Sequence, residues 1–98
     1  MNQTTLDTIR DEIDLLDHEI LKLLSLRKKK SLQALKYKLD SADGFSSGRD
    51  IKREQNILTT RKEAGSNLGL SPGFVERLFQ IIIEESLQAQ KGSSDNQT

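Results

Sequence analysis

The sequence contains no cysteine, and it has only one histidine and one proline among its 98 residues. The absence of cysteine excludes disulfides, thiolate metal ligands and cysteine nucleophiles, and it is compatible with a reducing compartment. With His18 as the only histidine, a histidine-rich metal site is excluded and a histidine-dependent nucleophilic triad is not expected. No glycine-rich phosphate loop or dinucleotide-binding fingerprint is present. The common signatures of metal, thiol and nucleotide chemistry are therefore missing.

Long apolar runs and a net charge are missing too. No uninterrupted apolar segment approaches the roughly 20 residues needed to span a bilayer, and the polar N-terminus lacks the apolar core of a signal peptide. Fifteen basic and fifteen acidic residues cancel, so the overall field gives no reason to expect nucleic acid or a membrane as partner. We therefore expect a soluble, cytoplasmic protein in which any preference for anions is local.

The length suits one domain, but the composition is poor in core-forming residues. Apolar side chains make up 34% of the chain, and even with the six glycines the apolar share stays below the roughly 45–50% usual for globular domains. A lone monomer would therefore have a thin core. We expect one domain over residues 1–91, followed by a disordered tail at 92–98.

Apolar spacing predicts an all-α fold of three helices, of which the first is unusually long. From Leu6 to Leu23, apolar residues recur at the alternating spacing of three and four that marks one helix face. No glycine or proline follows before Gly44, so the helix is predicted to run from about Leu6 to about Leu39. At 1.5 Å per residue this helix is roughly 50 Å long, whereas a compact domain of this size has a radius of gyration of about 13 Å. Such a helix must project beyond its own domain, and its apolar stripe needs a partner. The stripe consists of Leu6, Ile9, Ile13, Leu16, Ile20 and Leu23.

The remaining two helices are delimited by turn-forming residues. Residues 40–48 are rich in small and turn-forming side chains and predict a loop. The second helix is expected to begin near Asp50 and to stop at Gly65, a residue type suited to ending a helix. Its inward residues would be Ile51, Ile57 and Leu58.

The third helix has a strong start signal in Ser71-Pro72, an N-cap serine followed by a proline at the first helical position. The helix is predicted to end near Lys91, before the tail. Its predicted buried residues are Phe74, Val75, Leu78, Phe79, Ile81 and Ile82.

Polar side chains stand where these helices should continue apolar faces: Arg10, Arg27, Lys38, Asp50, Arg53, Glu54, Ser86 and Gln90. Arg27 and Lys38 are eleven residues apart, on nearly the same side of the first helix and roughly 16 Å along it, so they could grip both ends of a small anion. Arg10 lies roughly 25 Å from Arg27 and about 100° around the helix. It could reach such an anion only from an antiparallel copy of the helix. The alternative is that all three are solvated charges, as most lysines and arginines are.

The other polar positions also allow two interpretations. Ser86 and Gln90 lie four residues apart on one helix face, where uncharged hydrogen-bonding groups suit a buried ligand; fraying of the helix end would explain them as well. Asp50, Arg53 and Glu54 follow an i, i+3, i+4 spacing, so an N-cap and an internal ion pair would account for them without a ligand.

Taken together and in this order, these residues resemble the all-helical class of chorismate mutases, most closely the mutase domain at the N-terminus of bacterial bifunctional enzymes of phenylalanine and tyrosine synthesis. The resemblance covers about Leu6 to Gln90. It rests on Ile-Arg-Asp-Glu-Ile-Asp at 9–14, Leu-Arg at 26–27, Lys38, Arg-Asp-Ile-Lys-Arg-Glu at 49–54, Arg-Leu-Phe-Gln-Ile-Ile-Ile-Glu-Glu-Ser at 77–86, and Gln90.

The resemblance implies an intertwined homodimer with the long helices paired and two shared sites. Arg27 of one chain and Arg10 of the other would grip the two carboxylates of chorismate. Lys38 would contact a carboxylate and the ether oxygen, and Gln90 would donate a hydrogen bond to that same oxygen. The expected partners are therefore chorismate and a second copy of the chain.

The family pattern also assigns the remaining polar positions. Glu54 and the Asp50 region would hold the ring hydroxyl of chorismate, while Ser86 and Arg53 would support the ring carboxylate. The sequence departs from the common pattern in a connecting loop that is a few residues longer, at 40–48, and in the polar run at 28–31.

The reaction implied is the rearrangement of chorismate to prephenate, a unimolecular pericyclic step that needs no nucleophile, metal or redox cofactor. It needs a dianion held in its folded conformer and donors aimed at the ether oxygen, where negative charge develops. Two alternatives are isochorismate pyruvate lyase activity, whose known members lack the combination of Asp50, Glu54 and Ser86, and a helical dimerisation or regulatory module without activity. The presence of all eight polar residues argues against the second.

Overall fold

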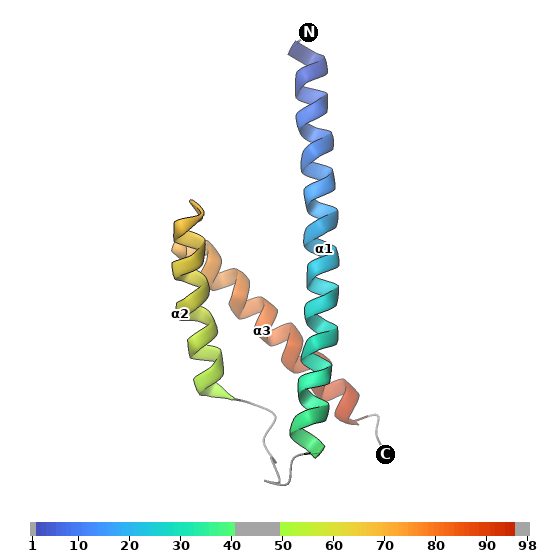
Figure 1. Cartoon of the computed structure of the whole chain (residues 1–98), viewed down its shortest axis with the longest axis vertical. Coiled ribbons are helices and arrows are strands. Elements are labelled where there is room, and N and C mark those ends of the chain that lie inside the picture. The colour runs from blue at the N-terminus through green and yellow to red at the C-terminus, as the bar shows by residue number, and fades with distance from the viewer. Residues whose placement is uncertain (1, 41–49, 96–98) are drawn as a thin grey trace. The chain divides into compact units, whose positions relative to one another are not determined.

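The computed structural model describes the backbone of residues 2–40 and 50–95, and the side chains of residues 5–37 and 50–92. Three α-helices and no strand occur in these ranges: α1 (Asn2–Asp40), α2 (Ile51–Asn67) and α3 (Pro72–Asp95) (Figure 1). The expected all-α fold of three helices is confirmed. The predicted loop was residues 40–48: its first residue, Asp40, is instead the last residue of α1, and the rest of the loop lies outside the described residues. The chain divides into two units, Met1–Lys30 and Ser31–Thr98.

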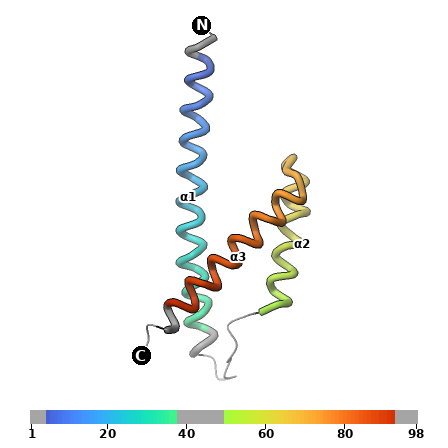
Figure 2. The backbone as a smooth tube through the Cα atoms, turned by 180° about the vertical axis from the view of Figure 1, so that it is seen from behind, coloured from blue at the N-terminus to red at the C-terminus, as the bar shows by residue number. Residues whose placement is uncertain are grey.

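The first unit is the N-terminal part of α1, which Figure 2 follows as one uninterrupted helix. α1 spans 39 residues and contains neither glycine nor proline, which would break it. The predicted apolar stripe is solvent-exposed in the single chain, with exposed fractions from 45% at Leu6 to 62% at Leu23. Leu15, Leu21 and Leu26, which lie off that stripe, are exposed as well. The described side chains of this unit, residues 5–30, therefore form no core of their own.

α2 begins where the sequence predicts and ends later. Asp50 is its N-cap, and the Asp50 carboxylate accepts a hydrogen bond of 2.9 Å from the Arg53 backbone N–H. The predicted stop at Gly65 was wrong, because the helix continues to Asn67 and the left-handed glycine is Gly69, with φ of 84°. Gly65 has a different role: a Cβ atom there would lie 2.7 Å from Val75 Cγ2, so the missing side chain lets α3 approach closely.

α3 starts at Pro72, and Ser71 Oγ accepts a hydrogen bond of 3.4 Å from the Phe74 backbone N–H, which confirms the predicted start. The helix ends at Asp95, beyond the predicted end near Lys91. Figures 1 and 2 both show α2 and α3 meeting at their short connection and diverging from it. An ion pair of 3.2 Å between Lys62 Nζ and Glu76 Oε1 links the two helices, and its partial exposure keeps its contribution to stability small.

The second unit has a small core built from all three helices. The buried apolar residues are Leu35 from α1, Ile57 from α2, and Val75 and Ile83 from α3. Gln90 is buried with them. No helix among the described residues is long and apolar enough to cross a membrane.

The predicted burial of α2 and α3 was only partly right. Val75 and Ile57 are buried as expected, and Leu58, Phe79 and Ile82 are partly buried. Ile83, which was not predicted, is buried, whereas four residues expected inside are exposed: Ile51, Phe74, Leu78 and Ile81. Periodicity marks the apolar side of a helix, but the neighbouring helices of the unit cover only a narrow strip of that side. The strip on α3 follows Val75, Ile83 and Gln90, and the rest of the apolar side stays open in the single chain.

Candidate functional site

The structure distributes the eight predicted site residues over both units. Arg10 and Arg27 lie on α1 in the first unit, where Arg10 is exposed and Arg27 is partly buried. Because α1 is continuous, these two residues stay roughly 25 Å apart along its axis. The second unit carries the other six: Lys38, Asp50, Arg53, Glu54, Ser86 and Gln90. Lys38 lies near the end of α1, and its side chain is outside the described residues.

Gln90 is the most enclosed of the predicted site residues whose side chains are described, with 9% of its surface exposed. Its Nε2 atom donates hydrogen bonds to Ser31, at 2.8 Å to the backbone carbonyl oxygen and at 3.1 Å to Oγ. A buried amide without partners would be costly, and these bonds offset that cost. Gln90 is therefore held in place by α1 before any ligand binds, and helix-end fraying does not explain it.

Asp50 and Arg53 have local partners in the structure. Asp50 caps α2, so the N-cap interpretation of this residue is confirmed. The cap bond goes to the Arg53 backbone, while the Arg53 guanidinium donates to Asn56 Oδ1 at 3.4 Å. Both side chains are exposed, so these local roles leave them accessible to a ligand.

Glu54 lines a cavity of about 370 Å³ between α2 and α3. It is the one predicted site residue in the lining, which consists of Glu54, Leu58, Gln80, Ile83, Glu84 and Leu87. Two carboxylates in one small cavity repel a dianion, and this lining contains no cation to offset them. The cavity is thus not an anion site by itself, although the Glu54 carboxylate can accept a hydrogen bond from a ligand hydroxyl.

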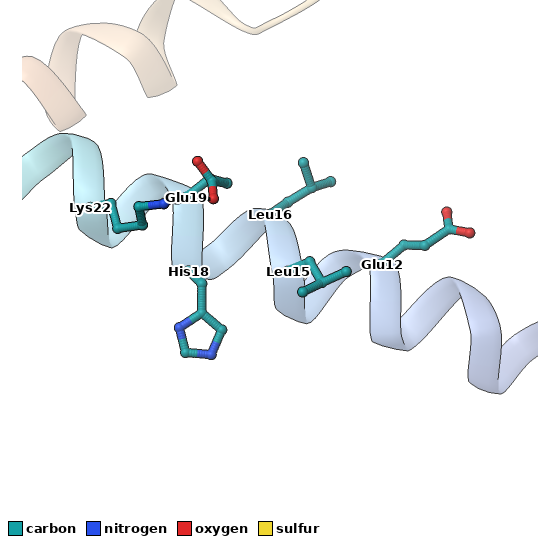
Figure 3. A pocket seen from close by; sticks show the side chains of 6 residues that line it. All are labelled: Glu12, Leu15, Leu16, His18, Glu19 and Lys22. Carbon is teal, nitrogen blue, oxygen red and sulfur yellow. Dashed lines mark hydrogen bonds and ion pairs between the residues drawn. The ribbon is translucent and has the colours of Figure 1, made fainter.

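A second hollow runs along α1 between Glu12 and Lys22. Figure 3 shows His18 and Leu16 leaving the helix on opposite sides. The Lys22 ammonium pairs with Glu19 Oε1 at 3.3 Å, an exposed contact within one helix. All the lining residues belong to this single helix, so the hollow encloses nothing.

Ser31 was missed as a functional candidate in the sequence. The signal was present, because a serine interrupts the apolar row of Leu24 and Leu35 on the first helix. Sequence spacing does not reveal that this serine lies against Gln90, 59 positions further along the chain.

Comparisons with known proteins identify the family of the chain. The family model of type II chorismate mutases matches residues 9–91. The bifunctional chorismate mutase/prephenate dehydratase of Buchnera aphidicola subsp. Schizaphis graminum (strain Sg) is 37% identical over 84 residues, covering 86% of this chain and 21% of that protein. The protein of the same description from Escherichia coli (strain K12) is 33% identical over 90 residues, covering 92% of this chain and 22% of its own length.

The chain belongs to the type II chorismate mutase family. It spans about a fifth of the length of these curated relatives.

Proposed function

We propose that this chain is an isomerase that converts chorismate to prephenate in aromatic amino acid biosynthesis. The observation that carries the proposal is the family match over residues 9–91, a range that includes all eight polar residues from Arg10 to Gln90. The names of the relatives, which join a chorismate mutase to a prephenate dehydratase, agree with this reaction and with its product.

The proposed mechanism uses position and charge. Arg27 and the Arg10 of a second chain bind the two carboxylates and hold chorismate folded, which lowers the entropic part of the barrier. Lys38 and Gln90 donate to the ether oxygen, where negative charge grows as the C–O bond breaks, and this interaction is stronger in the transition state than in the ground state. The buried amide of Gln90 supports this role, because an enclosed donor is worth more than one in water.

Residues of the second unit would bind the ring of the substrate. Glu54 and Asp50 would accept hydrogen bonds from the ring hydroxyl, and Arg53 and Ser86 would support the ring carboxylate. In support, the Arg53 and Asp50 side chains are exposed next to each other at the start of α2, and Ser86 lies one helical turn from Gln90 on α3.

We further propose that the active form is an intertwined homodimer. The first unit exposes six leucines and isoleucines along one stripe of α1, more contiguous apolar surface than a soluble monomer usually leaves open. An antiparallel second α1 would cover this stripe and would also bring Arg10 to the distant end, where Arg27 lies.

The reaction is tested by following chorismate absorbance with the purified chain and by identifying the product. Prephenate is expected. Release of pyruvate would instead assign a lyase activity, and unchanged chorismate would leave a structural role only. Sedimentation at micromolar concentration should give twice the chain mass of 11.1 kDa, and an active monomer would exclude the shared site.

Sharing of the site is tested by mixing two inactive variants, Arg10→Ala and Lys38→Ala, under conditions where subunits exchange. Each homodimer lacks one cation in both sites, whereas each heterodimer has one site with both cations and one site with neither. Random pairing makes half of the dimers mixed, so about a quarter of all sites should work. Recovery of about a quarter of the parental rate is expected. If heterodimers form and no activity returns, Arg10 does not act across the interface.

A further inference from the structure

The contact between Ser31 and Gln90 connects the C-terminal part of α1 to the end of α3. Ser31 is partly buried, and its carbonyl oxygen and Oγ both accept from Gln90 Nε2, at 2.8 and 3.1 Å. A helical carbonyl oxygen has a second lone pair, so Ser31 can accept from Gln90 as well as from its own helix. The backbone bond would exist with any residue at this position, but the bond to Oγ depends on serine.

The presence of serine here is not explained by helix formation. Serine is a poorer helix former than alanine, because its hydroxyl competes for backbone hydrogen bonds. The position also lies between Leu24 and Leu35, in the row of α1 that leads to Lys38. The hydroxyl has instead a specific acceptor role toward a buried side chain.

The orientation of the Gln90 amide decides whether it helps or hinders a developing negative charge. The nitrogen end donates a hydrogen bond, whereas the oxygen end would repel the charge. A backbone carbonyl can only accept, so the 2.8 Å bond directs the nitrogen end toward α1. Two oxygens of one residue lie close together, so one N–H can be shared between them as a three-centre bond. The second N–H, which diverges from the first, then remains for a ligand.

The anchor of this amide on α1 can be compared in position with Lys38. Lys38 follows Ser31 by seven residues on the same helix, which is about two turns, so both residues lie on nearly one face and roughly 10 Å apart along the axis. The amide anchored on Ser31 and the cation assigned to the ether oxygen therefore belong to the same face of α1.

We propose that Ser31 is a positioning residue for catalysis, whose hydroxyl fixes the Gln90 amide with its nitrogen toward the ether oxygen of chorismate. This inference rests on the proposed function. Ser31 acts through Gln90 and does not touch the reacting atoms. Its hydroxyl narrows the range of amide orientations, and the backbone bond alone would leave the amide freer to tilt.

The test is a double-mutant cycle of Ser31→Ala and Gln90→Ala, with Ser66→Ala as a matched control at an exposed helical serine. Ser31→Ala should lower kcat about three- to tenfold, the equivalent of one modest hydrogen bond, and leave KM within about twofold, because the bond to the ether oxygen strengthens mainly in the transition state. In the Gln90→Ala background the same substitution should change kcat by less than about twofold. Ser66→Ala should match the parent.

A second measurement does not depend on the residual rate of the Gln90 variant. The side-chain NH₂ signals of Gln90, identified by their loss in Gln90→Ala, should shift in Ser31→Ala and stay in place in Ser66→Ala. If the parent is active, three results would each overturn the positioning role alone. The first is an unchanged or higher kcat in a folded Ser31→Ala variant, and the second is an equal loss of kcat from Ser31→Ala in the parent and in the Gln90→Ala variant. The third is unshifted NH₂ signals of Gln90. A parent that leaves chorismate unchanged would overturn the proposed function, and the role of Ser31 with it.

Discussion

Gly65→Ala tests the closest approach between α2 and α3. An alanine Cβ at this position would lie 2.7 Å from Val75 Cγ2, whereas ordinary contacts begin at 3.4 Å, so one side must move by at least 0.7 Å (3.4 − 2.7). Val75 is 3% exposed and, as a β-branched helical residue, has one strongly preferred rotamer, so rotation of its side chain does not relieve the clash. Overpacking of this kind costs about 1–3 kcal/mol.

An opposing effect reduces this cost, because alanine is a better helix former than glycine by about 1 kcal/mol. Because the Val75 side chain cannot rotate away, the overpacking cost should lie in the upper part of its range. The free energy of unfolding should therefore fall by about 1–2 kcal/mol. Gly92→Ala is the control: this residue lies in the last turns of α3, and a Cβ added there would meet nothing within 4 Å. It should be neutral or slightly stabilising.

Urea unfolding followed by circular dichroism, at one fixed protein concentration, measures these differences. The variant Gly65→Ala/Val75→Ala removes the clashing methyl groups, so it should be more stable than the sum of the two single changes predicts, by about 1–3 kcal/mol. If Gly65→Ala is as stable as the parent, or if the two changes simply add, then close packing on Val75 is not the reason for glycine at this position.

Two further predictions concern the site. Asp50→Ala should destabilise the chain by about 1 kcal/mol through loss of the cap on Arg53 N. Asp50→Ser should restore the stability measured by urea unfolding but should not restore KM. Recovery of both would mean that Asp50 acts only as a helix cap. Gln90→Glu should be active at acid pH and lose activity as the pH rises through the pKa of the new carboxyl group, because the neutral acid can donate to the ether oxygen and the carboxylate would repel it. Burial beside the Ser31 oxygens favours the neutral acid and raises that pKa, whereas the charge of Lys38 lowers it. If folded, dimeric Gln90→Glu has the same pH–rate profile as the parent, Gln90 does not contact the ether oxygen.

Local signals in the sequence were sufficient for the presence of three helices and for the starts of α2 and α3, but not for the helix ends. A long α1 follows from the apolar spacing between Leu6 and Leu23 and from the absence of glycine and proline, although the helix begins at Asn2, earlier than the predicted Leu6. The starts of α2 and α3 follow from Asp50 and Ser71, whose caps are visible as residue types at fixed offsets. Gly65 was misread, because a glycine near a helix end has two physical uses. One is a left-handed turn, which Gly69 provides, and the other is room for a neighbouring helix. Only the position of α3 distinguishes them.

The sequence proposes the candidate site as a set of residues, but it does not reveal the contacts among them. Periodicity marks Gln90 as a polar residue on an apolar row, yet its enclosure depends on Ser31, from another helix. The same limit explains why Ile83 was missed and Ile81 wrongly placed inside. Neighbouring positions on one apolar face differ in burial according to which other helix covers them, and that information is long-range.

The open apolar surface of the first unit and the unequal distribution of the eight polar residues have a common explanation in the proposed dimer. The six stripe residues of α1 are exposed in one chain, and burying them supplies the driving force for pairing. Arg10 lies on that same length of helix, so the proposed pairing would cover the stripe and also carry a cation to the second chain. The apolar positions would set the register of the two helices, and the register would set where Arg10 arrives. In this arrangement, a substitution in the apolar stripe that weakens helix pairing would alter catalysis although the substituted residue does not touch the substrate. The reason is that folding, assembly and completion of the site depend on the same helix.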